Sequence, residues 1–519
     1  MNAGTAGGQP AIRRGVHDPL AATPPTFISS ELAGQTALSA AVDESQSHRP
    51  FQRAGYGKRK PPTPTGHLDS TPVRFTRLDV GTALLCAVAA ATAGVLGLIT
   101  LGRRSLWIDE ATDISLRELP WRAYLEIAFH QEGSQALYLL FLRPWLAATS
   151  TEEWVARIPS VAFAATAAAV LVALGIRLFQ SRMIGLGAGL LLATNGLVVS
   201  WSQQVRTYAL ATLLAVVVTY LFVQALESDG LRWWLVYGVA AGVSVYSQFF
   251  IALVLASHIP ALVLARRETT LRRWAVSAAI AFVIAVPALD FAFRHDQGQV
   301  SWISELTYDY LRSVVHDVSG ESWLVSAVAF VGLALLLFAV GRGGRDAWRA
   351  ALVASWLIVP LVGAIAISYF KPMLVARYLI VLVPALSLAA SYAISKLGRR
   401  AGVAALAVLL AVGLVHVRDW YRSPVPENWR GAVAYAEQGR QPDERILVYP
   451  SFMAAPVVYY GGPEIDTSQQ LTGDRARVVA YVQDAPAIEE WLSNSGYQAV
   501  ARTNFGAVDV WQVARSVPG

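Results

Sequence analysis

Long apolar runs with almost no charged residues recur along the chain between residues 81 and about 418. Each run has close to the ~20 residues that an α-helix needs to cross a bilayer. The pattern predicts an all-α polytopic membrane domain over residues 79–418, with about 11 transmembrane helices. The predicted spans are 81–101, 157–177, 183–201, 207–226, 232–248, 249–265, 274–292, 322–341, 349–368, 377–395 and 401–418.

The segment 136–149 is also apolar, but it is shorter and contains Arg143 and Pro144. Whether it crosses the membrane sets the sidedness of every later loop. If it does not cross, the short basic loops share one side with the N-terminus, as the positive-inside rule requires. These loops contain Arg177, Arg182, Arg232, Arg266, Arg267, Arg272, Arg273, Arg342, Arg345, Arg349, Lys396, Arg399 and Arg400. We therefore expect 136–149 to form a half-membrane or re-entrant helix on the outer side, packed against protein.

The two ends of the chain differ from the apolar middle. Residues 1–78 are rich in Gly, Pro, Ser, Thr, Gln and Arg, and we expect a disordered, cytoplasmic segment. From residue 419 onward, strand and helix patterns alternate, which predicts a small extracytoplasmic α/β domain over 419–519. We expect strands at 445–450, 477–482, 497–502 and 508–514, and helices at 428–440, 453–460 and 486–496. No phosphate loop or catalytic triad occurs there, so a packing or acceptor-docking role is favoured over a second active site.

Composition excludes several classes of protein. Of the 519 residues, 55% are hydrophobic and 15% are charged, which does not fit a soluble enzyme, a nucleic-acid-binding module or a secreted disulfide scaffold. The net charge of +6 is no sign of a nucleic-acid partner, because the arginines lie mostly in short loops. Cys86 is the only cysteine, so neither a disulfide nor a cysteine-based metal site is expected.

The first outer loop, 102–156, begins with two adjacent carboxylates. Asp109 and Glu110 follow Trp107 just past the first predicted span. A carboxylate at this boundary can act as a general base, or its oxygens can bind a divalent cation such as Mg²⁺ or Mn²⁺. The alternative is a pair of solvated acids that bind Arg103 or Arg104.

Three further polar clusters fall on the same predicted side. His130, Glu132 and Tyr138 stand at the entrance of 136–149, and a polar surface is the alternative interpretation. Gln203, Arg206 and Tyr208 lie where one span ends and the next begins. Lys371, Arg377 and Tyr378 precede a late span. Arginine binds phosphate in a bidentate manner, and Lys371 is the only lysine expected outside, so these cations suit a lipid-linked phosphate. Interfacial anchoring to lipid headgroups is the alternative for both basic clusters.

In their order and spacing, these clusters resemble the GT-C superfamily of integral-membrane glycosyltransferases. The similarity is to the protein O-mannosyltransferase-like and aminoarabinose-transferase-like families. Residues 107–111 read like the family's Trp-x-Asp-Glu-Ala, 137–145 like its Leu-Tyr-Tyr-Leu stretch and 157–160 like its Arg-x-Pro-Ser step. Residues 201–210 resemble Tyr-Ser-Gln-Glu-Ala-Arg-x-Tyr-Ala-Leu, and 372–384 carry the late Pro, Arg-Tyr-Leu and Pro.

The resemblance implies sugar transfer from a polyprenyl-phosphate donor to an acceptor on the extracytoplasmic face, usually with inversion. It assigns Asp109 as general base, with Glu110 assisting, and Arg206, Lys371 and Arg377 as candidates to bind the donor phosphate. Substrate contacts are expected from His130, Glu132, Tyr138, Gln203, Tyr208 and Tyr378. The expected partners are the lipid-linked donor, membrane lipids and a lipid, glycan or protein acceptor.

Two other functions fit parts of the pattern. One is a transporter or flippase of a lipid-linked sugar, although no internal repeat is visible and the polar clusters lie at the ends of spans. The other is an inactive scaffold subunit of a cell-envelope complex. The excess of Arg over Lys, with much Ala, Val and Gly, is typical of a high-GC bacterial genome, and we therefore expect a plasma-membrane protein.

Overall fold

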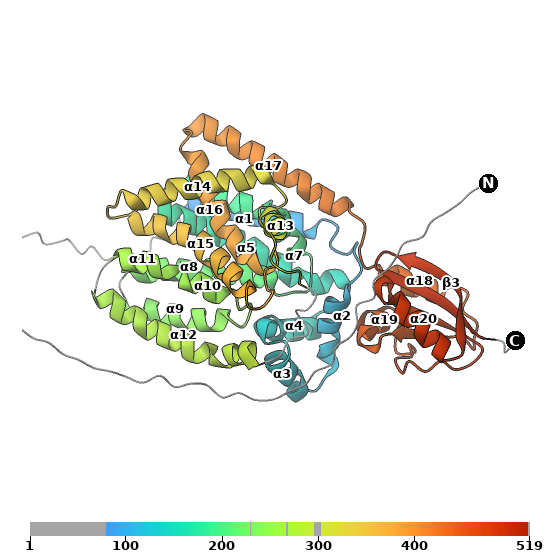
Figure 1. The fold of residues 1–519 in the computed structure, drawn as a ribbon. Coiled ribbons are helices and arrows are strands. Elements are labelled where there is room, and N and C mark those ends of the chain that lie inside the picture. Colours follow the sequence, from blue (N-terminus) through green and yellow to red (C-terminus); the bar gives the residue numbers. More distant parts are fainter. Residues whose placement is uncertain (1–78, 229, 266–267, 295–302, 517–519) are drawn as a thin grey trace, which may run out of the picture. The chain divides into compact units, whose positions relative to one another are not determined.

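The computed structural model describes residues 79–228, 230–265, 268–294 and 303–516. The N-terminal segment expected to be disordered, 1–78, lies outside these ranges, as do Arg266 and Arg267 of one basic loop. The described chain consists of a helical bundle, three short helices after α1, and a small α/β domain at the C-terminal end of the chain (Figure 1).

Eight helices in the described ranges are long and apolar enough to cross a membrane, or nine if one bent pair counts as a span. They are α1 (Val80–Leu98), α5 (Glu153–Phe179), α8 (Tyr208–Ser228), α12 (Glu268–Arg294), α14 (Trp323–Gly341), α15 (Ala347–Ser368), η4 with α16 (Tyr378–Ser395) and α17 (Arg399–Arg422). The bent pair is α6 (Arg182–Ala193) and α7 (Gly196–Ser202), which meet at 58°. Asn195 causes the break, because its side chain accepts a hydrogen bond from Val198 N and caps a new helix. The chain is a multi-pass membrane protein.

The number of long helices is lower than the eleven spans expected. The expected spans at 232–248 and 249–265 are occupied by α9 (Leu231–Ser244), α10 (Ile251–Ala256) and α11 (His258–Ala265). Turns at 245–250 and 257 interrupt the apolar sequence, so each helix is shorter than a bilayer crossing requires. Hydropathy does not register these interruptions, because the residues of the turns are themselves largely apolar.

Ion pairs join the ends of distant helices at one end of the bundle. Asp79, before α1, lies 3.1 Å from Arg182 at the start of α6. Arg177, at the end of α5, lies 2.7 Å from Glu227 at the end of α8. The chain therefore enters α1 and leaves α5 at the same end of the bundle, and the intervening segment 99–152 begins and finishes at the opposite end.

Three short helices fill that segment. They are α2 (Ile108–Ser115), α3 (Trp121–His130) and α4 (Ala136–Ala148), and they lie together in Figure 1. The 13-residue α4 occupies the segment expected to be re-entrant and is not among the helices long enough to cross. Leu106, Tyr124 and Leu139 are buried in a core shared by these helices, so the segment forms a packed layer and not an open loop. A similar short helix, α13 (Tyr308–Val318), lies between α12 and α14.

The C-terminal domain has the predicted α/β order. Its elements are α18 (Trp429–Glu437), β1 (Arg445–Tyr449), α19 (Ala454–Gly461), β2 (Arg475–Tyr481), α20 (Ala485–Asn494), β3 (Tyr497–Phe505) and β4 (Val508–Arg515). The sheet order is β1-β2-β4-β3, with β1 parallel to β2 and the other pairs antiparallel. Alternate strand residues point to opposite faces, so Val448 packs with α18 and α19, whereas Leu447 packs with α20.

Candidate active site

Helix α2 places three carboxylates within two turns, in different surroundings. Asp109 and Asp113 are four residues apart and therefore share one face of the helix, whereas Glu110 points about 100° away. The Asp109 side chain is 38% exposed, while Glu110 is completely buried. Only Asp109 of the three is thus accessible to a substrate.

Glu110 binds an arginine and does not face the site. Its two carboxylate oxygens accept hydrogen bonds from Arg157 Nε at 2.8 Å and Arg157 NH2 at 2.6 Å. One oxygen also accepts from Val205 N at 2.7 Å, and the other from Trp107 N at 3.3 Å. These contacts hold α2 to neighbouring segments, so the position of Glu110 gives no support to the expected assisting role.

Arg206 stands beside both carboxylates of the other face. It lies in the turn between α7 and α8, and its NH2 is 3.4 Å from Asp109 Oδ2. Its NH1 is 3.0 Å from Asp113 Oδ2. The bond from Val205 N to Glu110 fixes this turn next to α2, which explains how a residue 97 positions after Asp109 reaches it.

Asp113 was not predicted from the sequence as a site residue. Its second oxygen accepts from Gln135 Nε2 at 3.1 Å, and the same amide donates to Glu132 at 2.8 Å. Burial, opposed by Arg206 and assisted by the charges of Glu132 and Asp109, raises the pKa of Asp113 to about 8. The four-residue spacing from Asp109 would have indicated Asp113, had a helix been expected there.

Aromatic rings connect Arg206 to a second arginine. The Arg206 guanidinium lies 5.8 Å from the centre of the Trp107 ring, and the Trp107 and Trp201 rings meet edge to face at 6.2 Å. On the other side of Trp201, the Arg377 guanidinium is 5.8 Å from its ring centre. Two of the three predicted phosphate-binding cations are thus placed around one aromatic cluster, as cations over rings commonly are.

Tyr208 and Tyr378 belong to the same cluster. Tyr208 contacts Trp201 at 4.4 Å between ring centres and faces Tyr378 at 6.4 Å. The turn at 245–250 supports them, because Gln248 Nε2 donates to the carbonyl of Tyr378 at 2.8 Å. Burial raises the pKa of Glu132, which feels the charges of both Arg206 and Asp109 and so lies close to the same cluster.

Gln203 has a structural position. Its Nε2 donates to the carbonyls of Gly97 at 3.0 Å and Ile99 at 2.6 Å, and its Oε1 accepts from Trp420 Nε1 at 2.9 Å. These bonds tie the end of α1 to the end of α17. The Gln203 amide is engaged in these bonds and buried, so its position gives no support to the expected substrate contact.

The remaining predicted residues are not brought to Asp109. Tyr138 is buried, and its hydroxyl pairs with Ser160 Oγ at 3.1 Å. His130 is exposed and lies near the carbonyl of Glu126 in its own helix. Lys371 is half-buried, and within the described ranges no contact joins it to the aromatic cluster. The expected roles of these three residues therefore find no support in their positions.

The sequence left open whether Asp109 and Glu110 bind a divalent cation, and the positions of the two carboxylates give this no support. Arg157 neutralises Glu110, and Arg206 lies beside Asp109, so the pair offers no free set of oxygens. In the ranges that the structure describes, no group of three His, Cys, Asp or Glu side chains could hold a metal ion.

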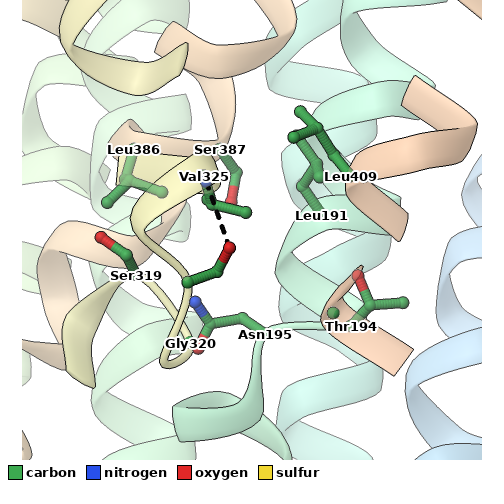
Figure 2. Close-up of a pocket in the computed structure, with 11 residues that line it drawn as sticks. Leu191, Thr194, Asn195, Ser319, Gly320, Val325, Leu386, Ser387 and Leu409 are labelled. Atoms are coloured by element: carbon green, nitrogen blue, oxygen red, sulfur yellow. Dashed lines mark hydrogen bonds between the residues drawn. The ribbon is translucent and has the colours of Figure 1, made fainter. Parts of the chain in front are cut away.

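Two cavities lie near the end of η4. The larger, of about 140 Å³, is almost wholly apolar, and its lining includes Ala329, Leu361, Leu379 and Leu382. The smaller, of about 10 Å³, lies between Leu386 on one side and Leu191 and Leu409 on the other (Figure 2). It has room for about one water molecule, which excludes it as a substrate site.

Comparison with known proteins identifies the fold. A profile of the family described as dolichyl-phosphate-mannose-protein mannosyltransferase matches residues 137–291. The crystal structure of ArnT from Cupriavidus metallidurans bound to undecaprenyl phosphate superposes with a TM-score of 0.55 at 14% identity, covering 82% of this chain and 97% of that one. The chain therefore has the GT-C fold of this membrane glycosyltransferase structure.

Two further GT-C structures agree. Apo ArnT from the same organism gives a TM-score of 0.54 at 15% identity, with the same coverage of 82% and 97%. The archaeal oligosaccharyltransferase AglB from Archaeoglobus fulgidus, in complex with an inhibitory peptide and a dolichol-phosphate, gives 0.52 at 12% identity, covering 85% of this chain and 75% of that one. No curated protein matches the chain.

The family match covers only part of the candidate site. The matched range includes the turn that carries Arg206, but it begins after Asp109 and ends before Arg377. The assignment of those two residues therefore depends on geometry: α2 and the segment before η4 are brought to the matched range by the contacts of Arg206 and Trp201.

Proposed function

We propose that the protein transfers a sugar from a polyprenyl-phosphate donor to an acceptor hydroxyl, with Asp109 as the general base. One observation carries the proposal. The only accessible carboxylate of α2 lies 3.4 Å from Arg206, and Arg206 shares an aromatic cluster with Arg377. A base and cations for a phosphate are thus adjacent, as this reaction requires.

In the proposed reaction the bond between the sugar C1 and the donor phosphate oxygen breaks as C1 bonds to the acceptor oxygen. The acceptor proton passes to the carboxylate of Asp109. The lipid phosphate leaves with the electron pair of the broken bond, and Arg206 and Arg377 stabilise its charge. A guanidinium close to both the base and the leaving group places the two reacting ends within one site.

The large apolar cavity supports a lipid-linked donor. Its lining residues Leu379 and Leu382 belong to η4, which begins directly after Arg377. A polyprenyl tail is soluble in the bilayer and would lie in this apolar cavity. Its phosphate is not soluble there, and would lie outside the cavity toward Arg377. The match to ArnT with bound undecaprenyl phosphate and to AglB with dolichol-phosphate agrees with this class of donor.

We place the site and the C-terminal domain on the extracytoplasmic side of a plasma membrane. The supporting observation is that the arginines of the basic loops, such as Arg177 and Arg182, lie at the end of the bundle opposite to Asp109. Basic loops favour the cytoplasmic side. Nucleotide sugars are cytoplasmic, so a site on the other side suits a lipid-linked donor.

The test is transfer of label from a panel of radiolabelled polyprenyl-phosphate sugars in membranes that carry wild type, Asp109→Asn or Glu118→Gln. Glu118 is an exposed carboxylate of the same segment and serves as a matched control. We expect wild type and Glu118→Gln to transfer label into a lipid, glycan or protein fraction, and Asp109→Asn to lose transfer. Equal transfer by all three would overturn Asp109 as the base. Failure of wild type with every donor would overturn the proposed function.

A further inference from the structure

The C-terminal domain contacts the residues that lead directly into the helix of the candidate base. Ser105 Oγ donates to the carbonyl of Glu427 at 2.5 Å, and Leu106 N donates to Tyr460 Oη at 2.8 Å. Arg104 NH2 donates to the carbonyl of Trp420, at the end of α17, at 2.8 Å. The segment before α2 is therefore bound residue by residue to the end of the last span and the domain that follows.

Glu427 reaches the first turn of α2 itself. Its Oε2 accepts from Ile108 N at 3.2 Å and from Trp429 Nε1 at 2.9 Å. Ile108 is the first residue of α2, and Asp109 is the second. The first N–H groups of a helix have no partner within the helix, so an outside acceptor is needed to fix them. Glu427 supplies that acceptor from 319 residues further along the chain.

The side chain of Ile108 is held by the same domain. It packs against the hydrophobic core that includes Trp429, Met453 and Val457. The residue directly before Asp109 thus packs against the core of the C-terminal domain, while Glu110, directly after it, is bound to Arg157 of α5. The two neighbours of Asp109 are therefore held by different parts of the chain, and the side chain of Asp109 is 38% exposed.

Tyr481 completes the contact. Its ring packs edge to face on Trp429 at 5.3 Å between ring centres, and Trp429 Nε1 donates to the Glu427 carboxylate at 2.9 Å. Burial and the neighbouring Glu427 carboxylate raise the pKa of Tyr481, and the charge of Asp109 adds to the effect. Tyr481 therefore lies close to both carboxylates, Glu427 and Asp109.

We propose that Glu427 is a positioning residue for Asp109, and that the C-terminal domain is thereby a working part of the active site. The inference rests on the proposed function for its catalytic consequence. By accepting the Ile108 N–H, Glu427 sets the direction of the first turn of α2, and so the distance from Asp109 to Arg206 and to the acceptor. Small misplacements of a reacting group cost about 100-fold in rate, so this single contact matters.

The experiment compares Glu427→Ala, Glu427→Gln and Tyr459→Phe in the full-length protein in nanodiscs. Tyr459→Phe is the matched control, because Tyr459 Oη donates to the carbonyl of Thr151 at 2.7 Å and so links the same domain to a place away from α2. We expect Glu427→Ala to lower kcat roughly 10- to 100-fold with little change in the donor KM. Glu427→Gln should keep most of the wild-type kcat, since its amide oxygen still accepts from Ile108 N. Tyr459→Phe should have the kcat of wild type.

A second readout does not depend on turnover. Hydrogen exchange of the backbone amides in the first turn of α2 should become faster in Glu427→Ala, and neither in Glu427→Gln nor in Tyr459→Phe. Unchanged exchange in Glu427→Ala would overturn the proposal. Equal losses of kcat in Glu427→Ala and Tyr459→Phe would also overturn it, because domain docking alone would then explain the effect. If wild type transfers no sugar, the proposed function fails, while the exchange data still decide whether Glu427 holds α2.

Discussion

Arg206 lies 3.0 Å from Asp113, a buried carboxyl that shares one face of α2 with the accessible Asp109. One guanidinium therefore serves two carboxyls, and Glu132 stands nearby as a third. Burial and the charges of the neighbouring Glu132 and Asp109 raise the pKa of Asp113 to about 8, so this carboxyl keeps its proton below that pH. While Asp113 is neutral, it competes less for Arg206, and the guanidinium can serve Asp109 and a donor phosphate.

This relationship predicts an alkaline limit to donor binding. As the pH rises through about 8, Asp113 ionises and competes with the donor phosphate for Arg206. The donor KM should therefore rise above that pH in wild type. Asp113→Asn cannot ionise, so its donor KM should stay flat over the same range. Initial rates at several pH values check this, and a parallel rise in both proteins would contradict it.

The same pKa shift has a consequence for stability. A carboxyl whose folded-state pKa lies above its unfolded value stabilises the fold at low pH, and this contribution disappears as the pH rises from about 4 to about 8. Wild type should thus lose thermal stability over this window relative to Asp113→Asn. Unfolding midpoints of the two proteins at pH 5 and pH 9 measure the difference, and a constant difference would refute the assignment.

Substitution of Glu110 should lower the free energy of unfolding much more than substitution of Asp109. Glu110→Gln leaves Arg157, which is 2% exposed, with an uncompensated buried charge, and breaking such a pair costs about 3–5 kcal/mol. Asp109→Asn alters a partly exposed side chain and should cost less than about 1 kcal/mol. Denaturation in detergent compares the two variants. The double variant Glu110→Gln/Arg157→Met should recover part of the loss, because it removes both charges.

The three predicted phosphate-binding cations should separate into two groups. Arg206→Lys and Arg377→Lys should each raise the donor KM roughly tenfold or more, since lysine lacks the planar fork that binds phosphate in a bidentate manner. Lys371→Ala should leave the donor KM within about threefold, because in the described part of the chain no ion pair or ring contact joins Lys371 to the aromatic cluster. Donor titrations of the three variants measure these KM values. A large rise of the donor KM in Lys371→Ala would indicate that Lys371 does bind the donor phosphate.

Filling the apolar cavity should discriminate between donors by the length of their tails. Ala329 lines the cavity of about 140 Å³, so Ala329→Phe introduces a ring into it. We expect the KM for a long polyprenyl donor to rise while that for a donor with one or two isoprene units stays the same. Competing the two donors in one assay measures this ratio directly. An equal effect on both donors would indicate general disruption of the bundle.

The elements of the C-terminal domain were predicted closely because their signals are local. The strand expected at 445–450 is β1 at Arg445–Tyr449, and the helix expected at 486–496 is α20 at Ala485–Asn494. Alternation of apolar residues and flanking turn residues is enough to define such short elements. The helices α2 and α3 were not predicted, because both are short and their boundaries depend on packing against α4 and the C-terminal domain.

The chemical site was predicted in part. The sequence indicated Asp109, Arg206 and Arg377, which the fold gathers around Trp107 and Trp201. It also indicated Gln203, whose amide instead joins the ends of α1 and α17. A polar residue at the end of a span can bind a substrate or form hydrogen bonds with a neighbouring helix. Only the tertiary structure, which shows its bonding partners, distinguishes the two roles.

The sequence by itself determined that this is a multi-pass membrane protein with a small α/β domain, since hydropathy and the period of apolar residues are properties of short stretches. It could not determine which of two adjacent carboxylates is free. Neighbouring residues on a helix point about 100° apart, so Asp109 and Glu110 face different surroundings once α2 is packed. Arg157 from α5 takes Glu110 and Glu427 from the C-terminal domain holds Ile108. Both partners come from distant parts of the chain, so only the tertiary structure leaves Asp109 open beside Arg206.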